Sequence, residues 1–416
     1  MVVVGAGIAG LAAARGLAEA GLSVVLVEAA GRVGGRVRTV RPAGSSLPVE
    51  TGAEFVHGRP PELLELIKEA GLTLFEREGI FYSFEDGRLR KTEWEESAFD
   101  VLDELPEEGD MPFSRFLQGK KLPQKIAARV TDYVEGFNAA DARVIGTAAL
   151  RKQQQAEEAI EGERVFRVRE GYDRVPLFLL DRFLTAGGRA HLDTRVTEVN
   201  WRPGDVLVQT GNAAVREIRA GRVVMAVPLG VLKVDGIKIS PLPDAAMKAI
   251  DGLAMGPATR ITLVFRERFW EDAAPGLSFL FASGESVSVW WSASPENSPE
   301  LTGWIGGPRA AKGPAGEALH DSAMATLRTV FGREDLDSLL VDWQTHDWQR
   351  DSLSLGAYSY VPVGALKASE ALAQVFEDTL YFAGEHTDVS GQWGTTHAAL
   401  RSGLRVVQQI RGKGKE

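Results

Sequence analysis

The chain of 416 residues contains no cysteine. This absence excludes disulfide bonds, thiolate metal sites and a cysteinyl bond to any cofactor. It leaves the cellular compartment open, and we take the cytoplasm as the default expectation. The sequence also lacks an apolar run of eighteen residues and a basic-then-apolar leader. We therefore expect a soluble protein with no membrane partner.

Charge of one sign is not concentrated anywhere, although the net charge is −10. An acidic surface without a basic patch argues against a nucleic-acid partner and is compatible with cationic substrates. The histidines His346, His386 and His397 do not suggest a ligand set, and we predict no metal site. The length indicates two domains, and the oligomeric state is left open.

The first forty residues predict a strand, a glycine turn, a helix and a second strand. The strand is Val2 to Val4, the helix runs from about Gly7 to Ala20, and the second strand ends at Val27. The helix N-terminus carries free amides and a partial positive charge, which suits a diphosphate, and Glu28 lies where a ribose hydroxyl needs an acceptor. The sequence therefore predicts a dinucleotide site. Its residues in this segment are Gly5, Gly7, Ile8, Ala9, Gly10, Glu28 and Ala29.

A second glycine pair, Gly34-Gly35, lies between Arg32 and Arg36. This loop would add amides and planar guanidinium contacts to the phosphates, or it is a basic surface turn. Together with the stretch Thr51-Gly52-Ala53-Glu54-Phe55-Val56-His57-Gly58, the loop resembles the flavin-containing amine oxidases, which include monoamine and polyamine oxidases. The resemblance implies FAD as the cofactor. It adds Arg32, Gly34, Gly35, Arg36, Gly52, Ala53 and Glu54 to the predicted cofactor site.

The C-terminal segment Tyr381-Phe382-Ala383-Gly384-Glu385-His386-Thr387, followed by Gly394-Thr395-Thr396-His397, looks like the family segment that passes under the flavin. A helix starting at Thr396 would aim amides at the isoalloxazine ring, where negative charge builds up on reduction. The resemblance places Glu385 near the ribityl or phosphate region and Val196 against the adenine. It adds Val196, Gly384, Glu385, Gly394, Thr395 and Thr396 to the cofactor site.

The resemblance also implies the reacting groups. Ala357 stands where covalently flavinylated relatives have a cysteine, so FAD is expected to be non-covalent. Tyr358 corresponds to one wall of an aromatic cage, which stabilises developing positive charge. Trp393 is our candidate for the opposite wall of the cage. Thr395 is an alternative candidate for that position, and Trp393 could equally be a buried core residue. His57 would accept a proton or a hydrogen bond from the amine.

Arg260 departs from the family pattern, because relatives usually hold a lysine there that binds a water touching flavin N5. Arginine keeps the positive charge but does not readily release its proton. We expect its guanidinium within one water of N5. The consequences for oxygen reactivity are left open.

The predicted fold class is α/β, with a Rossmann-like FAD-binding domain of the GR2 type interleaved with a substrate domain of mostly antiparallel sheet and helices. The FAD-binding domain comprises residues 1–58, 165–235 and 375–416, and the substrate domain comprises residues 59–164 and 236–374. The block Met111–Leu150 is predicted to be helical and to cover the flavin.

The predicted function is oxidation of a primary or secondary amine by hydride transfer to flavin N5. Imine hydrolysis then gives an aldehyde, and molecular oxygen is reduced to hydrogen peroxide. The sequence does not choose between a monoamine and a polyamine. An amino acid or porphyrinogen substrate is one alternative, and a poorly active flavoprotein scaffold is another.

Overall fold

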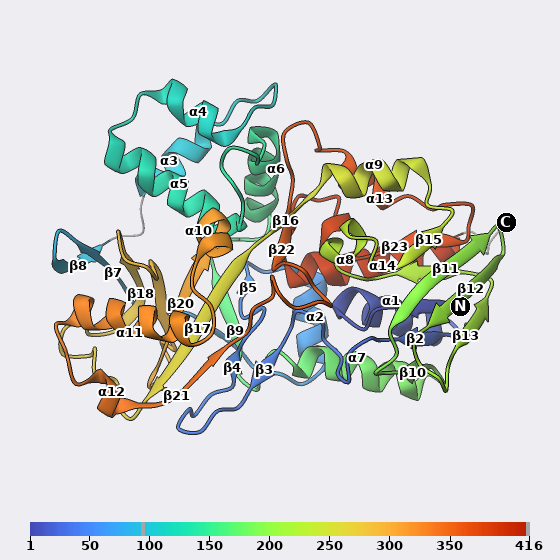
Figure 1. Cartoon of the computed structure of the whole chain (residues 1–416), viewed down its shortest axis with the longest axis horizontal. Coiled ribbons are helices and arrows are strands. Elements are labelled where there is room, and N and C mark those ends of the chain that lie inside the picture. Colours follow the sequence, from blue (N-terminus) through green and yellow to red (C-terminus); the bar gives the residue numbers. More distant parts are fainter. Residues whose placement is uncertain (93–95, 413–416) are drawn as a thin grey trace.

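A parallel sheet collected from four separate stretches of the chain holds the first glycine motif (Figure 1). The computed structural model describes residues 1–92 and 96–412. The strand order is β10-β2-β1-β14-β23, and every neighbouring pair is parallel. The strands are β1 (Val2–Val4), β2 (Val25–Val27), β10 (Arg189–His191), β14 (Val223–Met225) and β23 (Leu380–Phe382).

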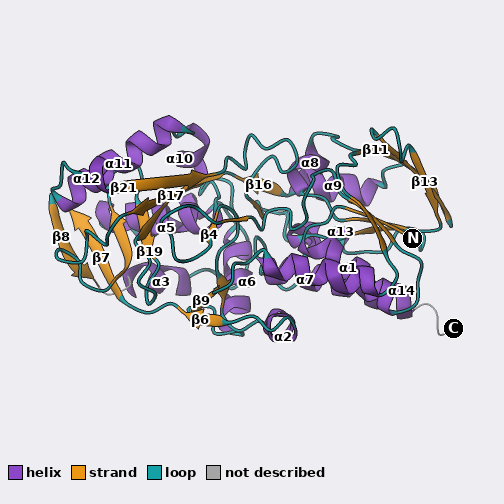
Figure 2. Cartoon of the chain, turned by 90° about the horizontal axis from the view of Figure 1, so that it is seen from below, coloured by secondary structure: helices purple, strands orange, loops and turns teal. Residues whose placement is uncertain are grey.

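Continuous apolar strands such as Val2–Val4 form this sheet because both of its faces are covered. One face packs on the helices α1 (Ile8–Glu19), α2 (Pro61–Glu69), α7 (Arg174–Thr185) and α14 (Thr396–Gly412). In Figure 2, α1, α7 and α14 lie side by side.

The other face shares a core with a four-stranded sheet and three short helices. The sheet order is β13-β12-β11-β15. Its members are β11 (Val196–Arg202), β12 (Asp205–Thr210), β13 (Glu217–Ala220) and β15 (Lys238–Ser240), and the helices are α8 (Leu229–Lys233), α9 (Asp244–Gly252) and α13 (Ala368–Leu372).

A seven-stranded sheet forms the far half of the molecule (left in Figure 1), away from both termini. Its order is β21-β17-β20-β19-β18-β7-β8, and β18 with β7 is its one parallel pair. The strands are β7 (Ile80–Glu85), β8 (Arg88–Thr92), β17 (Ala258–Phe265), β18 (Leu277–Ala282), β19 (Val289–Ser292), β20 (Glu300–Gly306) and β21 (Leu340–Thr345). Helices α10 (Gly307–Lys312), α11 (Glu317–Phe331) and α12 (Leu336–Leu339) connect β20 to β21 in the chain.

A helical cluster and three small sheets join the two halves (Figure 1). The helices are α3 (Glu96–Asp103), α4 (Phe113–Lys120), α5 (Gln124–Asn138) and α6 (Thr147–Glu158). The small sheets contain β3 (Thr39–Val40) and β4 (Val49–Glu50); β5 (Val56–His57), β6 (Leu74–Glu76) and β9 (Val165–Val168); and β16 (Ala254–Gly256) and β22 (Tyr358–Tyr360).

The predicted fold class is confirmed: a Rossmann-like parallel sheet and a mostly antiparallel sheet occur in one interleaved chain. Within the described ranges, no helix has the length and apolar character needed to span a bilayer. The domain ranges given above remain a prediction. They assign α9 and α13 to the substrate domain, but both helices pack on the same core as the parallel sheet.

Candidate active site

One cavity of about 1420 Å³ runs between the parallel sheet and the seven-stranded sheet. Its volume exceeds the 300–1,000 Å³ of typical small-ligand pockets, so it has room for a large cofactor together with a substrate. Every residue predicted for catalysis lines it, as does every residue predicted for the cofactor except Gly10.

Gly10 is the predicted cofactor residue that lies outside the cavity lining. A Cβ at this position would lie 1.9 Å from the carbonyl oxygen of Gly5. Gly10 therefore permits close packing of α1 against the turn that precedes it, and the spacing of the motif does not separate this role from ligand contact.

The first turn of α1 points into the cavity with its amides available. Gly7 caps the helix without a side-chain hydrogen bond, and Ile8 and Ala9 line the cavity. The first amides of a helix have no partner within the helix, so they are suited to bind a diphosphate. Glu28 lies beside them, and its carboxylate accepts hydrogen bonds from the amides of Ala6 and Ala30. These groups fit the pyrophosphate and ribose of a dinucleotide.

The two loop arginines bind protein groups. Arg32 donates to the carbonyls of Val33, Val37 and Gly35, so it holds its own loop in shape. Arg36 Nη1 donates to the Ala357 carbonyl at 2.9 Å and to Glu385 Oε1 at 2.8 Å. Both side chains line the cavity.

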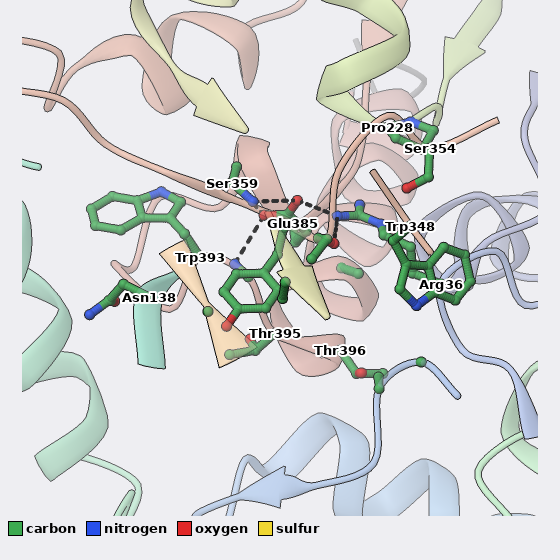
Figure 3. Close-up of a pocket in the computed structure, with 18 of the residues that line it drawn as sticks. Arg36, Asn138, Pro228, Trp348, Ser354, Ser359, Glu385, Trp393, Thr395 and Thr396 are labelled. Atoms are coloured by element: carbon green, nitrogen blue, oxygen red, sulfur yellow. Dashed lines mark hydrogen bonds and ion pairs between the residues drawn. The ribbon is translucent and has the colours of Figure 1, made fainter. Parts of the chain in front are cut away.

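Glu385 joins segments from both ends of the chain (Figure 3). Besides Arg36, it accepts hydrogen bonds from the Ser359 amide and hydroxyl and from the Gly394 amide, which lies 3.0 Å away. Burial opposes ionisation of this carboxyl, but the charge of Arg36 holds its pKa below the usual range. Its contact with the cofactor stays a prediction, while its structural role is to fix the loop of Arg36, β22 and the turn before α14.

The N-terminus of α14 completes the cofactor side of the cavity. The side chains of Thr395 and Thr396 face it, and Figure 3 shows both below Glu385. The hydroxyl of Thr395 accepts a hydrogen bond from the Ala398 amide and donates to the Gln392 carbonyl. The N-termini of α1 and α14 therefore line the same cavity from two directions.

Arg260 is buried in the cavity wall and paired with an acid. Its Nη2 lies 2.6 Å from Glu54 Oε2, and Nη1 donates to the Gly52 carbonyl at 2.9 Å. Glu54 also pairs with Arg167 Nε at 3.0 Å and accepts from the indole of Trp291. Burial disfavours the ionised carboxylate of Glu54, but the charges of Arg167 and Arg260 hold the pKa of Glu54 below its usual value. Arg260 is therefore a fixed cation and not a freely moving relay group.

A belt of aromatic rings surrounds the substrate end of the cavity. Successive rings lie with centroids between 5.3 and 6.5 Å apart. The hydroxyl of Tyr358 closes the belt by donating to the carbonyl of Phe137. In spatial order, the rings are Tyr133, Phe137, His57, Phe55, Trp291, Trp304 and Tyr358.

The sequence predicted only His57 and Tyr358 of this belt. The ring parallel to Tyr358 is Trp304, and the indole of Trp393 instead donates to the Asp388 carbonyl at 2.9 Å. In Figure 3, Trp393 lies on the opposite side of Glu385 from Arg36. The belt comes from five separate segments, so no local spacing reveals it, and the one available signal was the high frequency of aromatic residues on β18 to β20.

His57 is flanked edge-on by Phe55 and Phe137. Burial lowers its pKa to about 4, so the imidazole is neutral at physiological pH. A neutral ring can accept a hydrogen bond, so the predicted contact of His57 with the amine stays a prediction that this protonation state permits.

Carboxylates from the helical cluster line the cavity beyond the belt. They are Asp103 on α3, Asp132 and Glu135 on α5, and Glu157 and Glu158 on α6. The hydrogen-bond partner of Glu157 is the neutral amide of Gln153, at 2.9 Å. Burial raises the pKa of Glu157 to about 7. Among the described residues, no group of three or more acidic and histidine side chains is arranged to hold a metal ion.

Comparison with known proteins places this geometry in context. A family model described as flavin containing amine oxidoreductase matches residues 8–157 and 104–411. The chain is 30% identical to polyamine oxidase 2 of Arabidopsis thaliana, over 99% of this chain and 88% of that protein. It is 28% identical to lysine-specific histone demethylase 1 homolog 3 of Arabidopsis thaliana, over 99% of this chain and 30% of that protein.

Solved structures share the fold. Putrescine oxidase bound to putrescine superposes with a TM-score of 0.84 at 21% identity, covering 99% of this chain and 98% of that one. Cyclohexylamine oxidase from Brevibacterium oxydans gives a TM-score of 0.84 at 19% identity, covering 100% and 99% of the two chains.

Proposed function

The chain belongs to the flavin-containing amine oxidoreductase family, and we propose on this premise that it oxidises a diamine or polyamine with non-covalently held FAD. When bound, the flavin supplies the two-electron chemistry: it takes hydride from the amine α-carbon and returns the electrons to oxygen. The chain itself binds the amine, orients it and excludes water.

The observation that carries the choice of substrate is the Glu157 carboxylate, which lines the cavity beyond the aromatic belt with a neutral amide as partner. A partly buried carboxylate of this kind is stabilised by a cation. An amine whose reacting end lies at Tyr358 would place a second ammonium group toward α6. Asp132 and Glu135 add negative charge along the same wall.

Arginine pairing argues against an amino acid substrate. Three arginines line the substrate end of the cavity, and each already faces a carboxylate. Arg129 pairs with Glu85, Arg260 with Glu54, and Arg309 lies 3.9 Å from Asp132. A substrate carboxylate would have to displace one of these protein carboxylates.

We assign roles in the reaction to His57, Tyr358 and Arg260. His57 accepts a hydrogen bond from the reacting amine, and the face of Tyr358 stabilises the positive charge that develops on it. Arg260 keeps a fixed positive charge beside the reacting centre, where Glu54 limits its movement. The belt is apolar on its inner face and therefore excludes water from the reacting amine.

Anaerobic mixing with putrescine and butylamine tests the proposal. We expect putrescine to bleach the flavin absorption, with butylamine requiring a much higher concentration. A flavin that neither amine nor any longer polyamine reduces would contradict the proposal. Non-covalent binding is tested separately: acid precipitation should release all the flavin into the supernatant.

A further inference from the structure

The turn that leads into α14 also docks on α6, the helix that carries Glu157. Gln392 lies in this turn and is only 2% exposed. Its side-chain Nε2 donates to the Ala156 carbonyl at 2.8 Å, and its Oε1 accepts a hydrogen bond from Arg401 on α14. Ala156 directly precedes Glu157 in the chain. One buried amide therefore joins the helix of Glu157 to the helix that begins at the cofactor side of the cavity.

Helix α6 presents two different faces to its surroundings. Gln153 and Glu157 are four residues apart, line the cavity and bond to each other. Lys152 and Ala156 are also four residues apart and lie about 100° away around the helix axis, on the face that meets the turn. The Lys152 ammonium lies 5.8 Å from the centroid of the Trp393 ring. The position of the turn therefore determines where the cavity face of α6 lies.

A glycine allows the turn to approach the α6 backbone closely. Gly391 has a φ of +109°, and a Cβ at this position would lie 2.9 Å from the Lys152 carbonyl oxygen. Any larger residue would strain the turn and push it away from the helix. The turn therefore lies close enough for the Gln392 side chain to reach the Ala156 carbonyl.

The last turn of α6 is held at two points. The Ala156 carbonyl belongs to this turn, whose carbonyls have no partner within the helix, and Gln392 supplies a donor there. Just beyond the helix, the Arg59 amide donates to the Ile160 carbonyl at 2.6 Å. Loss of the Gln392 side chain should therefore shift the last turn of α6 without unfolding the helix.

The backbone of Gln392 serves the cofactor side independently of its side chain. Its amide donates to Asp388 Oδ2 at 3.1 Å, and its carbonyl accepts a hydrogen bond from the Thr395 hydroxyl at 2.7 Å. Trp393 and Thr395, which follow in the turn, both line the cavity (Figure 3). Replacement of the side chain alone should therefore leave the path of the turn toward α14 in place.

We propose that Gln392 is a positioning residue that holds Glu157 where the second ammonium group of a diamine reaches it, and so determines the preference for a diamine over a monoamine. The inference rests on the proposed function, in which Glu157 binds that ammonium group. Gln392 itself lies outside the cavity lining. It acts through the Ala156 carbonyl on the position of the neighbouring carboxylate.

The ratio of kcat/KM for putrescine to kcat/KM for butylamine tests this inference. We expect Gln392→Leu to lower this ratio by about tenfold through a higher KM for putrescine, because a displaced carboxylate loses a charge-assisted contact. KM for butylamine and kcat for both amines should stay within about twofold. Gln392→Glu should behave like Gln392→Leu, because an ionised carboxylate keeps a partner for Arg401 but has no hydrogen to donate to the Ala156 carbonyl.

Combination with Glu157→Gln shows whether Gln392 acts through that carboxylate. In the Glu157→Gln background, Gln392→Leu should cause no further change in the ratio, since the contact is already absent. Gln409→Leu is the matched control and should leave the ratio unchanged. Gln409 on α14 likewise donates from Nε2 to a carbonyl at a helix end, that of Ala373 after α13, at 2.8 Å and outside the cavity lining.

Four results would overturn the inference. Gln392→Leu could leave the ratio unchanged, or it could raise KM for both amines equally. Gln392→Glu could keep the wild-type ratio, or Gln392→Leu could lower the ratio as much in the Glu157→Gln background as in the wild type. A wild-type protein that oxidises butylamine as readily as putrescine, or that oxidises neither amine, would instead contradict the proposed function.

Discussion

Arg260 and Glu54 form an ion pair of 2.6 Å in the cavity wall, with side chains only 4% and 3% exposed. The positive charge expected from the sequence is therefore present, but a neighbouring carboxylate compensates it. Arg260 also stacks over Trp291, with its guanidinium carbon 5.5 Å from the ring centroid. The pair links the cavity wall to the buried cluster of Arg167 and Glu300 behind it.

Removing one member of this pair should destabilise the protein more than removing both. We expect Arg260→Met to lower the free energy of unfolding by about 3 kcal/mol, because Glu54 would keep its buried charge with one cation fewer. The double variant Glu54→Gln with Arg260→Met should recover part of the loss. Urea denaturation with excess FAD measures both. A loss in the double variant equal to the sum of the losses in Arg260→Met and in Glu54→Gln alone would show that the two side chains act independently.

Glu385→Gln should weaken FAD binding, because the carboxylate holds Arg36, β22 and the turn before α14 together. We expect the dissociation constant of FAD to rise by about tenfold or more, since a partly buried arginine loses its counter-charge. Flavin titration of the apoprotein gives the value. Glu50→Gln is the control: Glu50 is also buried but lies outside the cavity lining, and burial raises its pKa to about 7, so removing its charge should cost less. Similar losses in both variants would contradict the assigned role of Glu385.

Glu157→Gln should discriminate between a diamine and a monoamine. We expect KM for putrescine to rise by about tenfold, because a charge-assisted contact to the distal ammonium is lost. KM for butylamine should stay within about twofold, and kcat for both should change little. Steady-state oxygen consumption with the two amines measures these constants.

The pH dependence gives a second test of Glu157. With a pKa of about 7, its carboxyl is protonated below that pH, while both amines remain ammonium ions. The ratio of KM for putrescine to KM for butylamine should therefore rise as pH falls from 8 to 6, and this rise should vanish in Glu157→Gln. Glu161→Gln is the control, because Glu161 pairs with Arg164 outside the cavity lining. A pH effect that survives in Glu157→Gln must come from another group.

The residues that the sequence assigned to the cofactor, apart from Gly10, line one cavity, and the sequence could group them because their motifs are encoded locally. The turn from Gly5 to Gly7, the acceptor Glu28 and the helix start at Thr396 each follow from spacing within a few residues. Gly10 lies outside the cavity lining, and the sequence could not show this because one glycine spacing serves both ligand approach and helix packing.

The substrate half could not be predicted in the same way. Trp304 meets Tyr358 only because β20 and β22 both reach the end of α5, and the Glu54–Arg260 pair joins residues 206 positions apart. Such contacts depend on the register of strands from distant segments, which no local pattern specifies. A lone tryptophan or glutamate on a strand looks like an ordinary core or surface residue until its partner is known.

His57 should not titrate in the working pH range, and this determines how the rate depends on pH. Burial lowers the pKa of His57 to about 4, and the rings of Phe55 and Phe137 flank its imidazole. Burial also lowers the pKa of its titratable neighbour His397, to about 3. Because both imidazoles are already neutral above pH 5, proton loss from the substrate itself, with a pKa near that of lysine at about 10, limits the reactive fraction. We expect kcat/KM for butylamine to rise steadily from pH 6 to 9 without a break near 6.5. His57→Asn should raise KM a few-fold and leave the slope of that profile unchanged. An inflection between pH 6 and 7 that disappears in His57→Asn would instead make His57 the group that receives the proton.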